Sequence, residues 1–256
     1  MSSTGGTWSP ESNNIGDTGQ VPVAPPAARW RIVVPVKGGP AAKSRLASLP
    51  SMTRTELARA MALDTLAAVC AVIDPDDVCV VAGAADARGW LAGLGMTVLD
   101  DYGGGLDAAL QRGLGWADET PRAGAARERP PSHVAVLLGD LPALSGAELA
   151  CALDAAAAYP RAFVPDHLGE GTVLLTSDTA RLMRPAFGAG SARRHEQAGH
   201  RRLDLDLPGL RTDVDDADSL SLAVSVGVGR HTAAAVLGFL ATEHPPELSR
   251  AEHPKG

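Results

Sequence analysis

An acidic side chain follows an apolar run near the middle of the chain, where it could bind a metal ion. Residues 133–138 (HVAVLL) are typical of a buried strand, and Asp140 follows them after a single glycine. An ionised carboxylate at the end of a buried strand is costly unless it faces a cleft or a cation compensates it. Mg²⁺ is such a cation, because one or two carboxylates and substrate phosphates hold it in proteins. We therefore predict that Asp140 binds a metal ion, with capping of the following turn as the alternative.

A second group of carboxylates stands near the end of the chain, where four Asp residues fall close together. Asp216 is placed to cap the helix that begins there, and Asp218 falls in the first turn of that helix, where the helix dipole favours negative charge. Asp213 and Asp215 point to the same side if this segment is extended. We expect one of these two residues to complete the metal site with Asp140.

Cationic side chains follow the first predicted strand. Residues 31–36 (RIVVPV) form that strand, and a loop with two consecutive glycines, Lys37, Lys43 and Arg45 comes after it. Glycines let backbone N–H groups approach phosphates, and the three cations would neutralise a triphosphate. The spacing fits neither a Walker A loop nor G-x-G-x-x-G, so the alternative is an ordinary solvated loop.

Two glycine-rich segments in the second half of the chain are candidates for the pocket of a small anion. Residues 187–195 (FGAGSARRH) predict the start of a short helix with Ser191 and two Arg beside it, a combination that binds anions. Ser191 can instead be only the N-cap of that helix, and His195 is either a general base or an inert surface histidine. Residues 165–172 (PDHLGEGT) form a turn whose Thr172 hydroxyl could line the same pocket.

The order of the predicted elements indicates a single α/β domain. Short β-branched runs alternate with Ala-rich helical segments, which is typical of a doubly wound sheet with helices on both faces. We expect strands at 31–36, 78–82, 96–99, 133–138, 161–164 and 172–176, and helices at 53–72, 86–94, 106–117, 145–159, 190–198, 216–226 and 232–242. Thr53 and Glu56 predict a capping box at the start of the first helix. Ligands of such sheets gather at the carboxyl ends of the strands, and the candidate residues follow predicted strands.

Three polar stretches delimit this domain, which we place at residues 29–242. Residues 1–28 and 243–256 are rich in Ser, Gly, Pro or charged residues and predict disordered tails. Residues 119–132 (ETPRAGAARERPPS) predict an exposed loop within the domain.

Composition narrows the class of protein. The chain has 256 residues, enough for one α/β domain with a full core. Its formal net charge of −7 argues against a nucleic-acid partner. The three cysteines form no C-x-x-C pair, which argues against a disulfide framework or a zinc site. We find no targeting segment, and the apolar stretch 220–240 is too interrupted to span a membrane, so we expect a cytoplasmic protein. Oligomeric state stays open, with a homo-oligomer among the options.

Together these segments resemble the 2-phospho-L-lactate / phosphoenolpyruvate guanylyltransferase family, which acts in the biosynthesis of the deazaflavin coenzyme F-420. The most specific segments are AKSRL (42–46), LLGDLPAL (137–144), FGAGSARRH (187–195) and DVDDADSL (213–220). The resemblance implies a Rossmann-like nucleotidyltransferase fold with a mixed, mostly parallel sheet. It also implies transfer of GMP from GTP to a small phosphorylated carboxylic acid.

The resemblance assigns roles to individual residues. Four residues of the cationic loop would hold the GTP phosphates: Lys37, Lys43, Ser44 and Arg45. The segment 103–109 (GGGLDAA), with Gly105 and Asp107, would lie near the nucleotide, although the family usually has Asn in place of Asp107. An acid accepts hydrogen bonds but does not donate them as an amide does, which leaves the contact of Asp107 open.

The remaining assignments concern the metal and the acid. Mg²⁺ would be bound by Asp140 and Asp213, with Asp215 as the alternative second ligand. The phospho-acid would be held by Thr172, Gly188, Ser191 and Arg193. Glu170 stands in the turn before Thr172 where a smaller residue is usual.

The implied reaction needs no general base, because an already anionic phosphate oxygen attacks the α-phosphorus of GTP and pyrophosphate leaves. Phosphoenolpyruvate is favoured over 2-phospho-L-lactate only by association, since the Ala- and Arg-rich composition resembles that of bacterial members of high genomic GC content. Two alternatives stay open. The Asp213-Val214-Asp215 sequence also fits the metal motif of a nucleotide-sugar glycosyltransferase, and the chain could be a non-catalytic nucleotide-binding regulator.

Overall fold

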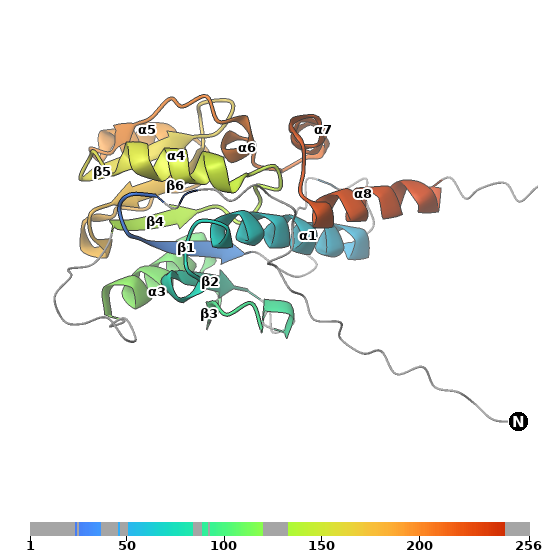
Figure 1. Cartoon of the computed structure of the whole chain (residues 1–256), viewed down its shortest axis with the longest axis horizontal. Coiled ribbons are helices and arrows are strands. Elements are labelled where there is room, and N and C mark those ends of the chain that lie inside the picture. Colours follow the sequence, from blue (N-terminus) through green and yellow to red (C-terminus); the bar gives the residue numbers. More distant parts are fainter. Residues whose placement is uncertain are drawn as a thin grey trace, which may run out of the picture.

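The computed structural model describes residues 24, 26–36, 46, 51–83, 89–91, 93–119 and 133–243. These residues form one seven-stranded sheet in the order β3-β2-β1-β4-β6-β5-β7, with helices on both faces (Figure 1). The predicted α/β class with a mixed, mostly parallel sheet is therefore confirmed.

One half of the sheet is parallel throughout. It consists of β3 (Thr97–Asp100), β2 (Val78–Ala82), β1 (Trp30–Val36) and β4 (His133–Leu137). All residues of β1 and β2 are buried, which explains why both read as continuous apolar runs rather than as alternating ones.

The other half of the sheet contains the antiparallel pairs. β6 (Thr172–Ser177) runs antiparallel to β4 and to β5 (Arg161–Pro165). The short β7 (Arg201–Arg202) pairs with β5 in parallel and forms the edge of the sheet. Because β6 reverses direction, its first residue lies where β4 and β5 end.

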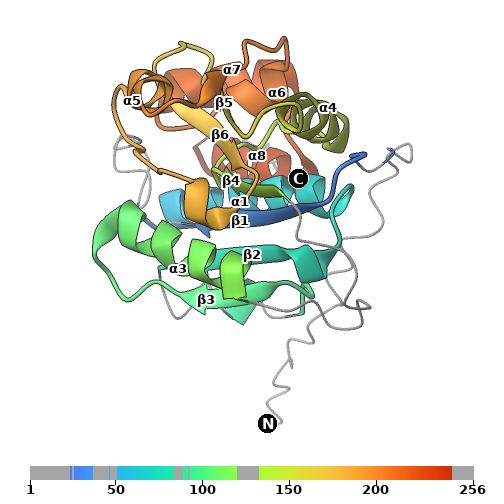
Figure 2. The same ribbon diagram turned by 90° about the vertical axis from the view of Figure 1, so that its left-hand side faces the viewer.

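Helices cover the two faces of the sheet with different partners (Figure 2). On one face, α1 (Ser51–Cys70) and α4 (Gly146–Ala156) pack against apolar side chains of β1, β2 and β4. On the opposite face lie α3 (Gly105–Glu119), the 3-10 turn η2 (Ala180–Leu182) and α5 (Ser191–Gln197). A second 3-10 turn, η1 (Pro75–Asp77), leads into β2.

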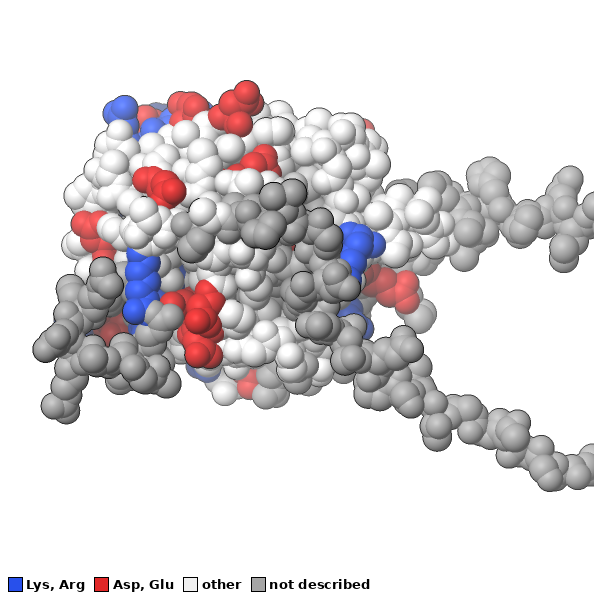
Figure 3. Space-filling view, viewed as in Figure 1, with Lys and Arg blue, Asp and Glu red and all other residues white. Residues whose placement is uncertain are grey.

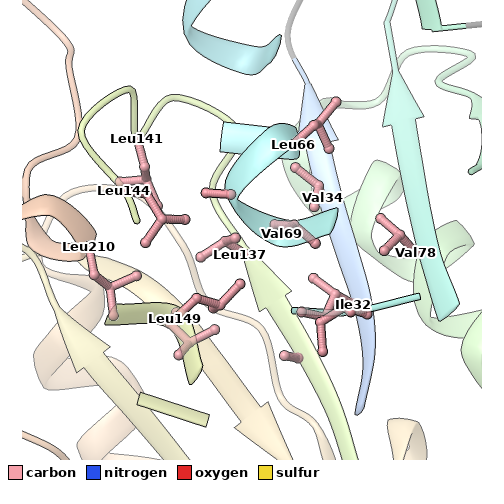
Figure 4. Packing of buried hydrophobic residues seen from close by; sticks show 14 of the residues in the cluster. Ile32, Val34, Leu66, Val69, Val78, Leu137, Leu141, Leu144, Leu149 and Leu210 are labelled. Carbon is pink, nitrogen blue, oxygen red and sulfur yellow. The ribbon is translucent and has the colours of Figure 1, made fainter. Parts of the chain in front are cut away.

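The first of these faces contains the larger core (Figure 4). Leu66 and Val69 of α1 lie over Ile32 and Val34 of β1 and over Leu137 of β4. Full burial of one such side chain stabilises the fold by about 1.5–3 kcal/mol, so this layer fixes α1 firmly relative to β1 and β4.

The last three helices are α6 (Pro208–Arg211), α7 (Ala217–Val226) and α8 (Arg230–Glu243). α6 contacts α4 and α7, whereas α7 and α8 pack against α1, and α8 runs beside α1 (Figure 1). The buried Asp64 of α1 accepts hydrogen bonds from the backbone N–H groups of His231 (3.1 Å) and Thr232 (2.8 Å). These N–H groups belong to the first turn of α8 and have no partner within the helix, so Asp64 caps α8 from a different helix.

Several predicted element boundaries differ from the structure. α1 begins at Ser51, so Thr53 lies inside the helix and the predicted Thr53–Glu56 capping box is wrong. The N-cap of α5 is Gly190 in the left-handed conformation (φ 70°), so the interpretation of Ser191 as N-cap is also wrong. Asp216 does cap α7, as predicted, through a hydrogen bond to Ser219 N–H.

The predicted tails and the predicted loop lie almost wholly outside the described residues. Of the helix expected at 86–94, residues 86–88 and 92 also lie outside them, and residues 89–91 are helical. Near the first tail, Ala27 N–H donates to Asp154 at 2.8 Å, and Ala28 packs against the core.

Surface charge on the face of Figure 1 is dispersed. Lys and Arg atoms of the described residues form separate spots between uncharged and acidic ones rather than one broad basic surface (Figure 3). In the described part of the chain, no helix is both long and apolar enough to cross a membrane.

Candidate active site

The candidate site residues converge where the parallel strands end. Gly83, directly after β2, donates its N–H to the carbonyl of Val36 at the end of β1 (3.3 Å). Asp101, directly after β3, donates to the carbonyl of Ala82 at the end of β2 (3.0 Å). The carboxyl ends of β1, β2 and β3 are thus level with one another.

The antiparallel half adds residues to the same side. Leu138, directly after β4, donates its N–H to the carbonyl of Val173 in β6 at 3.0 Å. Thr172, the first residue of β6, therefore lies beside the end of β4, and Asp140 comes three residues after that end. We call this side of the sheet, where β1 to β5 end and β6 begins, the carboxyl side.

Gly139 lets the chain after β4 pass close to β1. A Cβ atom at this position would lie 2.8 Å from the carbonyl oxygen of Pro35 and 3.1 Å from a methyl group of Val36. Only glycine fits without displacing the backbone of β1. Asp140 consequently follows a residue that touches the very end of β1.

Thr65 of α1 holds the other side of this turn. Its buried hydroxyl accepts a hydrogen bond from the N–H of Leu141 at 3.0 Å and donates one to the carbonyl of Met61 at 2.9 Å. Asp140 therefore stands between two fixed points, Gly139 against β1 and Leu141 against α1.

Asp213 lies beside Asp140 although the two are far apart in the sequence. The N–H of Val214 donates to the backbone carbonyl of Asp140 at 3.1 Å. Burial raises the pKa of Asp213 to about 7, and the negative charges of Asp140, Asp215 and Asp166 add to this rise. The structure thus brings Asp140 and Asp213 together, with the exposed Asp215 near enough to act on Asp213.

The donor set fits a hard cation better than a soft one. The groups that raise the pKa of Asp213 are all carboxylates, whose oxygens suit Mg²⁺ and not a thiolate-binding metal. Within the described residues no three His, Cys, Asp or Glu side chains form a complete metal site. Mg²⁺ fits this arrangement, because it is usually bound by one or two carboxylates together with substrate phosphates.

The turn between β5 and β6 is ordered by its own polar groups. The carboxylate of Asp166 accepts hydrogen bonds from the N–H groups of Glu170 (2.9 Å) and Gly171 (2.8 Å). Arg211 donates to the carbonyls of Pro165 (3.2 Å) and Asp166 (2.8 Å). Arg211 comes two residues before Asp213, so it ties the acidic segment to the turn that leads to Thr172.

The segment before α5 is held by hydrogen bonds from groups that the sequence analysis predicted to bind an anion. The N–H groups of Ser191 and Ala192 donate to the carbonyls of Gly188 and Glu170, both at 3.0 Å. Arg194 donates to the carbonyls of Ala186, Phe187 and Ala189 at 2.6–3.0 Å. In this structure these two N–H groups and the guanidinium of Arg194 therefore bind protein carbonyls.

The other residues predicted for the phospho-acid remain around this segment. Gly188 is exposed and has φ 102°, which favours glycine. The side chain of Ser191 is buried and Arg193 is exposed on α5. The hydrogen bond from Ala192 N–H to the carbonyl of Glu170 connects α5 to the turn that leads into Thr172.

The sequence suggested a surface position for His195, but the structure buries it. Its Nδ1 lies 2.9 Å from the hydroxyl oxygen of Thr172, and its Nε2 accepts a hydrogen bond from Ala186 N–H at 2.9 Å. Burial, then the nearby His200 and Arg194, lowers its pKa to about 4, so the ring is neutral at pH 7. With both nitrogens engaged, the general-base interpretation of His195 is not supported.

The predicted nucleotide-binding residues are only partly described. Gly105 opens α3 with φ 85°, and Asp107 is exposed in its first turn, a few residues after β3 ends on the carboxyl side. Lys37, Lys43, Ser44 and Arg45 lie outside the described residues. Val36, the last residue of β1 and the residue before Lys37, lies beside Gly139.

Sequence reasoning missed three polar residues that organise the site: Thr65, Asp166 and Arg211. Asp166 carried the same signal as Asp140, a carboxylate directly after a buried strand. Thr65 carried a weaker one, a hydroxyl within an apolar helix face. Arg211 carried none, because its partners come from the distant β5–β6 turn.

Comparison with known proteins agrees with this geometry. The family model "Guanylyl transferase CofC like" matches residues 30–235. A phosphoenolpyruvate guanylyltransferase from Streptomyces coelicolor is 45% identical over 215 residues, covering 83% of this chain and 98% of that protein. Phosphoenolpyruvate guanylyltransferase 2 from Rhodococcus jostii is 39% identical over 203 residues, covering 79% and 88%.

Among solved structures, the fold resembles a candidate nucleotide-diphospho-sugar transferase from Desulfovibrio desulfuricans. The TM-score is 0.59 at 17% sequence identity, covering 84% of this chain and 96% of that one. This likeness concerns the fold alone. Taken with the match over residues 30–235 and the relatives of 39–45% identity, the chain belongs to the CofC-like guanylyltransferase family.

Proposed function

We propose that this protein transfers GMP from GTP to the phosphate of phosphoenolpyruvate, giving enolpyruvyl-diphospho-guanosine and pyrophosphate. The observation that carries the proposal is the convergence of Asp140 and Asp213 at the carboxyl side of the sheet, in a family of guanylyltransferases. The relatives named phosphoenolpyruvate guanylyltransferase support the choice of acid, and the family resemblance supports a role in coenzyme F-420 biosynthesis.

In the proposed reaction, a phosphate oxygen of phosphoenolpyruvate attacks the α-phosphorus of GTP. The bond from the α-phosphorus to the bridging oxygen breaks, and pyrophosphate leaves with the electron pair. The attacking oxygen is already anionic at neutral pH, so no protein base has to remove a proton. This agrees with the neutral, doubly hydrogen-bonded state of His195.

Charge neutralisation and positioning are then the main tasks of the protein. Asp140 and Asp213 would hold Mg²⁺, with Asp215 as the alternative to Asp213; when bound, the ion would neutralise phosphate charge. Lys37, Lys43, Ser44 and Arg45 are proposed to bind the triphosphate, and Gly105 and Asp107 to lie near the nucleotide. Thr172, Gly188, Ser191 and Arg193 are proposed to hold the acid.

The test is to incubate the protein with Mg²⁺, each nucleoside triphosphate and each of phosphoenolpyruvate, 2-phospho-L-lactate and a phosphoglycerate. Mass spectrometry identifies the product, and a coupled assay measures pyrophosphate. We expect pyrophosphate and a diphospho-guanosine adduct with GTP and phosphoenolpyruvate. An adduct with 2-phospho-L-lactate alone would change the acid, and GTP binding without any adduct would contradict the proposed activity.

A further inference from the structure

The contacts of His195 determine which of its nitrogens carries the proton. The backbone N–H of Ala186 points to Nε2 at 2.9 Å, and a backbone amide can only donate. Nε2 must therefore present its lone pair. Because the ring is neutral at pH 7, the proton resides on Nδ1.

This tautomer determines the role of the Thr172 hydroxyl. Nδ1–H faces Thr172 Oγ1 at 2.9 Å, so His195 donates and Thr172 accepts. Thr172 then has its own hydroxyl proton left to donate. Within the described residues that hydroxyl has no hydrogen-bond partner other than His195, although the Thr172 residue is only 3% exposed.

A buried hydroxyl donor without an acceptor costs about 1–3 kcal/mol, so a ligand oxygen that accepts this hydrogen bond would be bound favourably. Thr172 lies on the carboxyl side, beside the end of β4, where the acid is proposed to bind. We infer that His195 is a positioning residue: with its tautomer fixed by Ala186 N–H, it donates to Thr172 and leaves the Thr172 hydroxyl as a dedicated hydrogen-bond donor to an anionic oxygen of the phospho-acid. This inference rests on the proposed function for the identity of that acid.

The same histidine also anchors the loop that carries Gly188. Its Nε2 holds Ala186, while Arg194, the preceding residue of α5, binds three carbonyls of residues 186–189. Phe163 and Phe187 pack against the imidazole with ring centroids 5.9 and 5.2 Å away, which keeps it from rotating. The donor direction of Thr172 is thus built into the free protein.

The tautomer can be measured without any substrate. Long-range ¹H–¹⁵N correlation spectra of the histidine-labelled full chain at pH 7 distinguish Nδ1–H from Nε2–H rings. A His195→Leu spectrum assigns the signal among the seven histidines. We expect the Nδ1-protonated form; an Nε2-protonated or a charged His195 would overturn the inference, whatever the protein catalyses.

A matched pair of variants tests the effect on substrate. Asn and Leu both lose the contact with Ala186, but His195→Asn keeps an N–H donor toward Thr172 and His195→Leu does not. We expect His195→Leu to raise KM for phosphoenolpyruvate about tenfold, like Thr172→Val, with KM for GTP unchanged. His195→Asn and Thr172→Ser should stay within about threefold of the original protein.

The control is His200→Phe, which changes a second buried imidazole 5.7 Å from His195 that makes no hydrogen bond to Thr172. It should leave KM for phosphoenolpyruvate unchanged. Equal effects of His195→Asn and His195→Leu, or additive effects of His195→Leu and Thr172→Val, would contradict a positioning role. If the unaltered protein uses a different acid, the proposed function changes, and the same comparison is made with that acid.

Discussion

The two halves of the site have opposite electrostatic states. Around Asp140 and Asp213, burial raises the pKa of Asp213 to about 7, and the neighbouring carboxylates of Asp140, Asp215 and Asp166 add to this rise. Around Thr172 and α5, by contrast, Arg194 and His195 bind protein groups and the histidine is neutral. In the acidic half the ionised form of Asp213 is therefore disfavoured, whereas in the α5 half Arg194 and His195 already bind protein groups.

This difference explains how the same fold can serve both tasks. Carboxylates that repel one another bind a divalent cation more strongly, because the ion relieves repulsion as well as forming new bonds. A substrate with several negative oxygens gains more from a rigid surface of aligned donors. The predictions below test whether the two halves behave in these different ways.

The largest effect is expected for Asp140→Ala. Removal of a metal-binding carboxylate should lower kcat about 10³-fold or more, because the phosphate charge is no longer neutralised. The pyrophosphate assay measures turnover, and circular dichroism checks the fold. The control is Asp118→Ala. Asp118 lies in α3, at the other end of that helix from Asp107, and pairs with Arg181 of η2, so its removal should leave turnover unchanged.

Asp213→Asn should stabilise the metal-free protein at pH 8. Burial raises the pKa of Asp213 in the folded protein to about 7, above the ordinary value of 3.8 for Asp, so the unfolded chain loses this proton at lower pH. The contribution of Asp213 to the free energy of unfolding is therefore fully present below about pH 4. It is lost as the pH rises toward 7, by an amount on the order of 1–4 kcal/mol. Urea unfolding of the two proteins at pH 5 and pH 8 measures it.

The expected pattern is a gain for Asp213→Asn at pH 8 that shrinks at pH 5, and that Mg²⁺ abolishes by stabilising only the original protein. If the variant is less stable at both pH values, the ionised form of Asp213 is not disfavoured by burial and neighbouring carboxylates, and the contrast between the halves fails.

Arg194→Lys tests the α5 half. Lysine keeps the charge but lacks the planar fork that reaches three carbonyls. We expect a loss of about 1–3 kcal/mol in unfolding free energy and a several-fold rise in KM for the phospho-acid, with metal affinity unchanged. Should the charge of Arg194 itself bind substrate, Lys would instead retain most of the original KM.

The smallest effect is expected for Thr65→Val, which removes the hydroxyl that holds Leu141 next to Asp140. Metal affinity should fall about threefold to tenfold as the turn loosens. Thr176→Val is the matched control. Thr176 lies in β6 toward the end away from Thr172, and its buried hydroxyl donates to the carbonyl of Ala162 in β5. Both variants should lose similar unfolding free energy, and only Thr65→Val should weaken metal binding.

The features that could be predicted from the sequence are those set by local pattern. Apolar runs located β1, β2 and β4, and strand direction then placed Asp140 and Thr172 on one side of the sheet. Carboxylate chemistry predicted that Asp213 or Asp215 would join Asp140, and the family resemblance favoured Asp213. The hydrogen bond from Val214 N–H to the carbonyl of Asp140 places Asp213 beside Asp140.

Features that depend on distant partners could not be predicted. Arg194 was expected to bind an anion, because the sequence does not show the three carbonyls that fold back to it. His195 was expected at the surface, because its burial comes from Phe163 and Phe187 in other elements. The capping box at Thr53 failed because α1 begins before it, at Ser51.

The central claim is that Asp140 and Asp213 bind one shared divalent ion, and titration with Mn²⁺ followed by electron paramagnetic resonance tests it most directly. The account predicts one tightly bound Mn²⁺ per chain, weakened at least about tenfold by Asp140→Asn and by Asp213→Asn, with little further loss in the double variant. Two independent ions, or a single variant that binds Mn²⁺ as the original protein does, would contradict it.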